Sequence, residues 1–96
     1  MASKFNIRVT MRTVQGFEPL CDFYIGTDRE AAIGLFQQLE ADDEVNEGAI
    51  LQLDFIELMN GLPVYLNIKH CSLQQLACNC KTITKEVFKQ RNLALG

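Results

Sequence analysis

The stretch that decides the fold lies in the second half of the chain, where residues 50–70 read ILQLDFIELMNGLPVYLNIKH. Two extended runs flank the dipeptide Asn60-Gly61, and Asn-Gly at such a place predicts a β-hairpin because both turn positions need a positive φ. A two-residue loop also predicts the register. It pairs Met59 with Leu62, Glu57 with Val64, Phe55 with Leu66, Leu53 with Ile68 and Leu51 with His70. This register places an apolar ladder on one side of the hairpin.

The first half of the chain predicts a second pair of strands. Residues 5–12 read FNIRVTMR, and the strict alternation of apolar and polar residues indicates a strand with one buried face and one wet face. Gln15-Gly16 opens a turn, and a further extended run covers about residues 20–25. We expect its inward side to carry Cys21, Phe23 and Ile25.

Two capping boxes predict where helices begin. Residues 27–30 (TDRE) pair Thr27 with Glu30, and residues 72–75 (SLQQ) pair Ser72 with Gln75. The first predicts a helix ending near Ala41, and the second a helix of about 18–20 residues. Apolar residues recur at helical spacing in both segments. They are Ala32, Ile33, Leu35, Phe36 and Leu39 in the first, and Leu73, Leu76, Cys80, Ile83 and Val87 in the second. The threonines at 82 and 84 leave open whether the second helix is continuous or broken.

The element order is therefore strand, strand, helix, strand, strand, helix (ββαββα). We predict an α+β fold in which a four-stranded, mainly antiparallel sheet carries both helices on one face, a two-layer sandwich. The 96 residues, of which 48% are hydrophobic, suit one modest core, so residues 1–96 are expected to form a single domain. The order of the strands in the sheet stays open.

The composition limits the cellular compartments and the binding partners that we expect for this chain. The net charge of −3 disfavours binding to nucleic acid through overall charge. The chain contains no run of about 18 apolar residues to cross a membrane and no apolar segment within Met1–Arg8 to serve as a secretory signal. We therefore expect a cytoplasmic protein whose four cysteines are thiols. Their even number keeps two disulfides as the alternative.

Residues 70–80 contain the one group of candidate metal ligands or nucleophiles. His70 and Cys71 adjoin on a strand, where neighbouring side chains diverge, which disfavours a catalytic pair. Cys78 and Cys80 lie about 200° apart around a helix, so they could share a metal ion only if the helix were broken. The acidic segment 42–48 (DDEVNEG) predicts a solvated loop. We expect no enzyme, cofactor or metal, and we keep a cysteine-based metal or redox site as an alternative.

The hairpin register leaves a group of apolar residues on the side opposite the core. Ile56, Leu58, Pro63 and Tyr65 lie together there, and Met59 borders them. Monomeric proteins rarely expose such a cluster. We therefore predict that these five residues form an interaction surface, used in a homodimer or by an accessory subunit that binds another protein.

The same side of the sheet supports a second hypothesis. It is expected to carry Arg8, Arg12, Tyr65 and Lys69, and a basic sheet face with an exposed aromatic ring is typical of modules that bind single-stranded nucleic acid. The alternative function is therefore a nucleic-acid-binding or regulatory module.

Overall fold

A computed structural model describes residues 3–41 and 50–93, of which residues 92 and 93 by their backbone alone. The acidic segment 42–48 lies outside the described residues. The elements follow the predicted ββαββα order. They are β1 (Lys4–Thr13), β2 (Gly16–Gly26), α1 (Arg29–Gln38), β3 (Leu51–Met59), β4 (Leu62–Cys71) and α2 (Leu73–Leu93).

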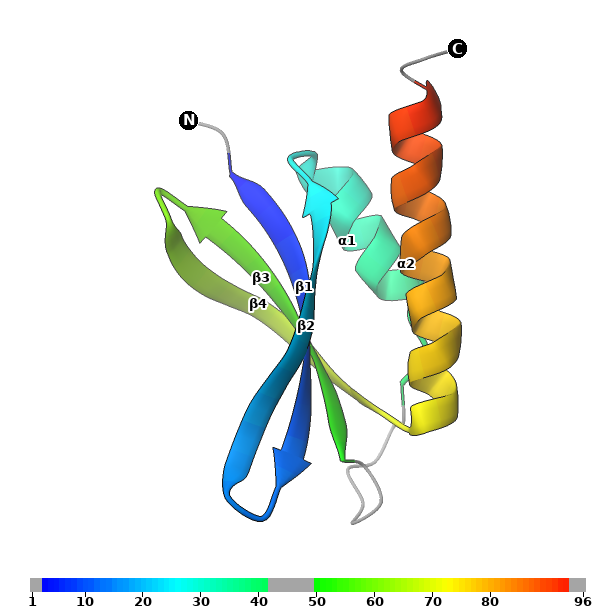
Figure 1. Ribbon diagram of the computed structural model, residues 1–96. Coiled ribbons are helices and arrows are strands. Elements are labelled where there is room, and N and C mark those ends of the chain that lie inside the picture. The colour runs from blue at the N-terminus through cyan, green and yellow to red at the C-terminus, as the bar shows by residue number, and fades with distance from the viewer. Residues whose placement is uncertain (1–2, 42–49, 94–96) are drawn as a thin grey trace.

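The four strands form one antiparallel sheet in the order β2-β1-β3-β4. The two hairpins therefore meet through their first strands, β1 and β3, which leaves β2 and β4 as the edges of the sheet. Figure 1 shows both helices on one side of a strongly twisted sheet, with α2 beside β2 and α1 close to β1. The predicted two-layer α+β sandwich is confirmed.

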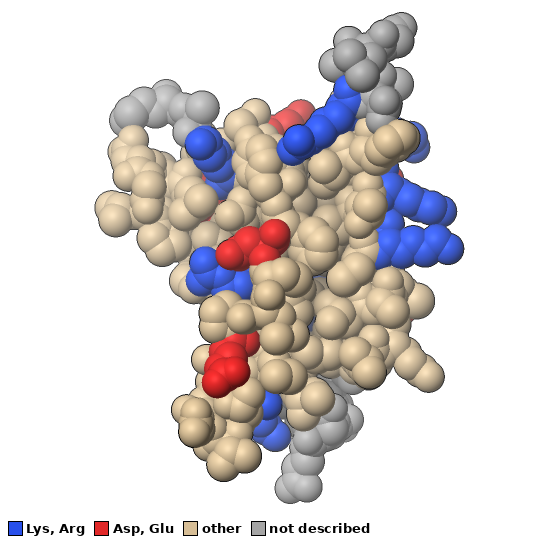
Figure 2. Space-filling view, in the orientation of Figure 1, with Lys and Arg blue, Asp and Glu red and all other residues tan. Residues whose placement is uncertain are grey.

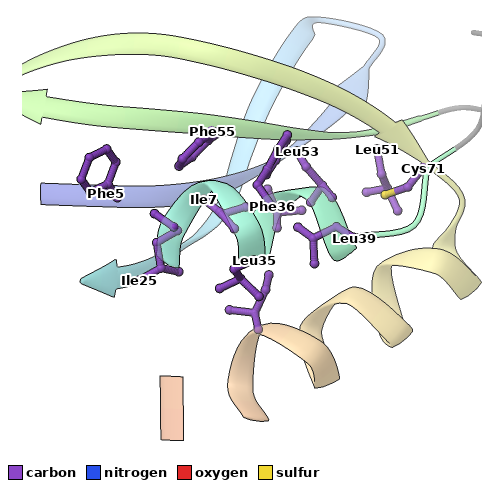
Figure 3. Close-up of a cluster of buried hydrophobic side chains, with 13 residues drawn as sticks. Phe5, Ile7, Ile25, Leu35, Phe36, Leu39, Leu51, Leu53, Phe55 and Cys71 are labelled. Atoms are coloured by element: carbon purple, nitrogen blue, oxygen red, sulfur yellow. The ribbon is translucent and has the colours of Figure 1, made fainter. Parts of the chain in front are cut away.

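The core lies between the helices and one face of the sheet (Figure 3). The alternation in β1 works as predicted, because Phe5, Ile7 and Val9 are all buried beneath the helices. Phe36 of α1 stacks on Phe55 of β3 with their ring centroids 5.0 Å apart. Burying one such side chain stabilises a fold by about 1.5–3 kcal/mol, so a few contacts of this kind hold α1 on the sheet.

The two helix starts differ in how well the capping boxes predicted them. In α1 the N-cap is Asp28, whose Oδ1 accepts a hydrogen bond from the Ala31 amide at 3.2 Å, so the prediction of Thr27 is wrong by one residue. Asp28 is itself a strong capping residue. In α2 the box is confirmed, because the Gln75 amide donates to Ser72 Oγ at 3.2 Å and the Ser72 amide donates to Gln75 Oε1 at 2.9 Å.

Helix α2 is continuous for 21 residues despite its two threonines. Thr82 Oγ1 donates to the Cys78 carbonyl at 3.1 Å, and Thr84 Oγ1 donates to the Cys80 carbonyl at 2.7 Å. The hydroxyls thus bond to the preceding turn and leave the helical ladder in place. In the described part of the chain, no helix has the length and apolar character needed to span a membrane.

The hairpin register is right near the turn and wrong beyond it. Pairing follows the prediction from Met59 opposite Leu62 as far as Ile56 opposite Tyr65, and there the register shifts by one residue. The observed partners of Phe55, Leu53 and Leu51 are Asn67, Lys69 and Cys71. A β-bulge is the cause, since the extra residue Leu66 has no partner on β3. The shift buries Cys71 in the core in place of His70.

Candidate functional site

The sheet face turned away from the helices, called here the open face, carries a compact apolar group. Asn6 and Arg8 alternate with the buried residues of β1 and therefore point away from the core. Side chains opposite each other in antiparallel strands share a face, so the partners of Asn6 and Arg8 on β3, and the partners of those on β4, also lie on the open face. The apolar residues among these partners and their neighbours form what we call the open-face patch. It consists of Ile56 and Leu58 of β3 and Pro63, Tyr65 and Ile68 of β4.

The structure brings four of the five predicted surface residues together. Leu58, Pro63 and Tyr65 reach the surface of the patch, whereas Ile56 is only 2% exposed and forms its floor. Met59 is the exception. It pairs with Leu62 and alternates onto the helix face, where both side chains extend beyond the helices and remain exposed. The expectation that Met59 borders the patch is wrong.

Ile68 belongs to the patch although the sequence placed it in the core. The predicted register set Ile68 opposite Leu53, but the bulge sets it opposite Asp54 on the open face, with 45% of its surface exposed. A two-residue loop sets Ile68 opposite the buried Leu53 only if neither strand contains a bulge. The bulge itself has no clear signal in this part of the sequence.

A hydrogen-bonded polar network borders the patch. Arg8 Nε lies 2.9 Å from Asp22 Oδ1, and Arg8 Nη1 donates to the Tyr65 hydroxyl at 3.3 Å. The hydrogen bond with Asp22 raises the pKa of Arg8. Beside this pair, the buried Asp54 accepts from Thr10 Oγ1 at 3.1 Å and from Gln52 Nε2 at 2.7 Å. Together these bonds join all four strands.

The basic set expected for nucleic acid does not gather on one face. Arg8, Arg12 and Tyr65 lie on the open face, but the bulge turns Lys69 to the helix face, which corrects the prediction. Lys69 Nζ donates to the carbonyls of Phe36 and Leu39 at 2.7 and 3.0 Å, where a cation complements the end of α1. Figure 2 shows other basic side chains projecting from α2, on the helix side of the molecule.

The four cysteines are thiols. Cys71 is fully buried under the helices while the adjoining His70 alternates onto the open face, as expected for neighbours on a strand. Burial raises the pKa of Cys80, and nearby Cys21 raises it further. Within residues 3–41 and 50–93, no group of three or more His, Cys, Asp or Glu side chains is placed to hold a metal ion.

Each sheet edge carries a local obstacle to an added strand. On β4, the Ile68 amide donates to the side chain of Asn67 at 2.8 Å, so this amide is not free to pair with another chain. On β2, Pro19 lacks an amide hydrogen and the strand is bulged beside it. Bulges, proline and occupied amides are common devices against edge-to-edge association. The open face is therefore the better candidate for contact with a partner.

The site thus consists of an exposed apolar patch beside an ion pair, on a sheet face that neither helix covers. Its arrangement suits contact with another surface. Arg8, Tyr65 and Asp54 beside the patch have hydrogen-bond partners within the chain, whereas Asn6 Oδ1, opposite Ile56, is buried without one. Comparisons of the chain with protein-family models, with curated proteins and with solved structures give no match.

Proposed function

We propose that this chain is a small non-enzymatic domain that acts through protein–protein contact, and that the contact is a homodimer formed through the open face. The observation that carries the proposal is the open-face patch, in which Tyr65 and Ile68 are 52% and 45% exposed. Contiguous apolar surface of this kind marks interaction sites. Because its cysteines are thiols, we also propose the cytoplasm as its location.

The charges of the open face support a second copy as the partner. By the strand register, this face carries Lys4, Arg8 and Arg12 against Asp22 and Asp54. Arg8 and Asp22 neutralise each other, and Asp54 is buried with both carboxylate oxygens hydrogen-bonded. A twofold axis sets identical surfaces against each other, so a face that is close to neutral avoids the repulsion that a strongly charged one would meet.

The size of the open face is also sufficient. Four strands spaced about 4.8 Å apart and about ten residues long at 3.3 Å per residue span roughly 600 Å². A standard interface buries about 800 Å² of accessible surface on each partner, and accessible surface exceeds the flat area because side chains are rough. Two such sheets would pack face to face about 10 Å apart.

Sedimentation equilibrium tests the proposal with Ile68→Glu and Leu58→Asp, which place a charge on the patch from two different strands. We expect the wild type to be a dimer and each variant to weaken the dimer at least about tenfold, because each carboxylate loses its water when the patch is covered. Ile68→Glu is the sharper of the two, since Lys4 lies opposite Leu58 and Asp54 lies opposite Ile68. Leu73→Glu is the matched control. Leu73 is 72% exposed on α2, so this variant should remain dimeric.

Circular dichroism and urea unfolding accompany each variant, so that loss of the dimer is separated from loss of the fold. A wild type that stays monomeric at about 1 mM would overturn the homodimer, since an interface of this size normally binds more tightly. In that case the accessory-subunit hypothesis, in which a different protein covers the patch, takes its place. Dimers that persist in both patch variants would also contradict the proposal.

A further inference from the structure

A pocket of about 270 Å³ opens on the helix face, between α1 and β4. From α1 its wall includes Arg29, Ile33 and Gln37, which are spaced by four residues and so lie on one side of the helix. The pocket is separate from the open face, since α1 covers the opposite side of the sheet. An inference about it is therefore independent of the proposed dimer.

The floor of the pocket is apolar. The stacked rings of Phe36 and Phe55 lie between α1 and β3 in Figure 3 and form part of the lining. Leu66 completes the floor, because it packs on the core although the bulge leaves it without a partner on β3. Phe36 and Phe55 are only 2% and 3% exposed, so the floor offers a hydrocarbon a narrow apolar surface, to which the half-buried Leu66 contributes.

The rim of the pocket is rich in hydrogen-bond donors. Glu57 Oε1 accepts from Arg29 Nη1 at 2.9 Å, yet the Arg29 side chain remains 57% exposed and a guanidinium has five N–H groups. Asn67 uses its side-chain oxygen to accept from the Ile68 amide, which leaves its NH₂ group as the end available to a ligand. Gln37 adds an exposed amide.

The charges around the pocket favour an anion. Arg29 is the cation that lines the pocket, and Glu57 is the carboxylate paired with it. Lys69 is not part of the lining, although its Nζ lies 4.9 Å from the centre of the Phe36 ring. Glu57 has only 7% of its side chain exposed, so a ligand meets the guanidinium before it meets this carboxylate. A carboxylate pairs with the planar guanidinium in a favourable geometry.

We propose that this pocket binds a small amphiphilic carboxylate, with a chain of about eight carbons over Phe36, Phe55 and Leu66 and its carboxylate against Arg29. The volume lies just below the 300–1,000 Å³ typical of pockets for drug-sized ligands, which limits the ligand to a short chain. Apolar floor and cationic rim are both needed, so neither a hydrocarbon without a head group nor a bare anion uses the whole site.

Octanoate is the probe, titrated below its micellar concentration into ¹⁵N-labelled protein at pH 7 and followed by amide chemical shifts. We expect saturable shifts centred on Ile33, Gln37 and Asn67, with a dissociation constant below about 1 mM. Octylamine and octanol carry the same chain with a cationic and a neutral head. Both should bind at least about tenfold more weakly, since neither forms a charge-assisted pair with Arg29.

Two variants separate the pocket from the rest of the surface. Ile33→Trp fills the pocket while keeping the Arg29–Glu57 pair, and should weaken octanoate binding at least about tenfold. Gln38→Trp adds the same ring at an exposed position of α1 outside the pocket and should leave binding unchanged. Arg29→Gln should remove the preference for octanoate over octanol.

Four results would overturn the proposal. They are the absence of saturable shifts up to about 5 mM octanoate, shifts centred on the open face, equal binding of octanoate and octanol by the wild type, and unchanged binding by Ile33→Trp. Circular dichroism of Arg29→Gln checks that the protein still folds when the buried Glu57 has lost its partner. Two results decide the question even if Arg29→Gln unfolds. They are the preference of the wild type for octanoate over octanol and the weaker octanoate binding of Ile33→Trp.

Discussion

Asn79 shows at the scale of one residue what the apolar pattern of α2 does not reveal. It lies three residues after Leu76 and four before Ile83, on the buried side of the helix, and is 1% exposed. Its side-chain oxygen accepts from the Glu40 amide at 2.7 Å, and its NH₂ group donates to the Glu40 carbonyl at 2.9 Å. Asn79 therefore ties the chain leaving α1 to α2.

Replacing Asn79 tests this tie. Asn79→Ala should lower the free energy of unfolding by about 1–3 kcal/mol, because both backbone groups of Glu40 lose their partner and a small cavity remains. Urea unfolding measures the change. Gln74→Ala, at an exposed position of the same helix, should stay within about 0.5 kcal/mol of the wild type. Equal costs for the two variants would show that the tie adds no stability.

The raised pKa of Cys80 predicts how the rate of its alkylation depends on pH. Burial raises its pKa above the ordinary value of 9.0, so a smaller fraction of thiolate is present near pH 8 than in an unperturbed thiol. Alkylation by iodoacetamide should therefore be slower than that of N-acetylcysteine amide, and its rate should reach half its maximum above pH 9.0. Peptide mapping of the reacted protein follows Cys80 by itself. A midpoint at or below pH 9.0 would contradict the shift.

At the scale of elements, the turn and the bulge of the second hairpin control the strand pairing over different parts of the hairpin. The predicted Asn60-Gly61 turn is confirmed, with φ of +55° and +79° at the two positions. It controls pairing for four residues on each strand, and the bulge then resets the register. This reset places Ile68 in the open-face patch and sends Lys69 to the end of α1.

Two glycine substitutions separate backbone conformation from packing. Space for a methyl group exists at Gly61 and at Gly34, since no atom lies within 4 Å of either added Cβ. Gly61→Ala should cost about 1–2 kcal/mol of stability because of its positive φ. Gly34→Ala, inside α1, should gain up to about 1 kcal/mol from helix propensity. Thermal unfolding measures both, and a shift of equal sign in the two variants would contradict this account.

At the scale of the whole molecule, the proposed dimer couples folding to association. The midpoint of its thermal unfolding should rise with protein concentration, by roughly 3–5 °C for each tenfold increase. The reason is that unfolding also separates the two chains, and a higher concentration favours the associated state. Ile68→Glu should show a midpoint that does not change with concentration. A wild-type midpoint that is equally constant would agree with a monomer and contradict the dimer.

The sequence determined the elements and most of the core. Periodicity, the Asn-Gly turn and the second capping box depend on neighbouring residues, and local interactions of this kind are visible in one chain. They predicted the ββαββα order, the buried face of β1 and the presence of Tyr65 on the side away from the core. The error at Thr27 is local too, because Asp28 is an equally good cap one residue later.

Only the tertiary structure decided the strand order and which side chains meet. The bulge lies where β4 also meets α1, a segment far from it in sequence, and it exchanged the places of Ile68 and Lys69. The same shift dispersed the basic set expected for nucleic acid and brought Asn67 opposite Phe55, where it lines the pocket. Because a shift of one residue reverses every side chain of a strand, a small long-range effect decides what each face of this sheet can bind.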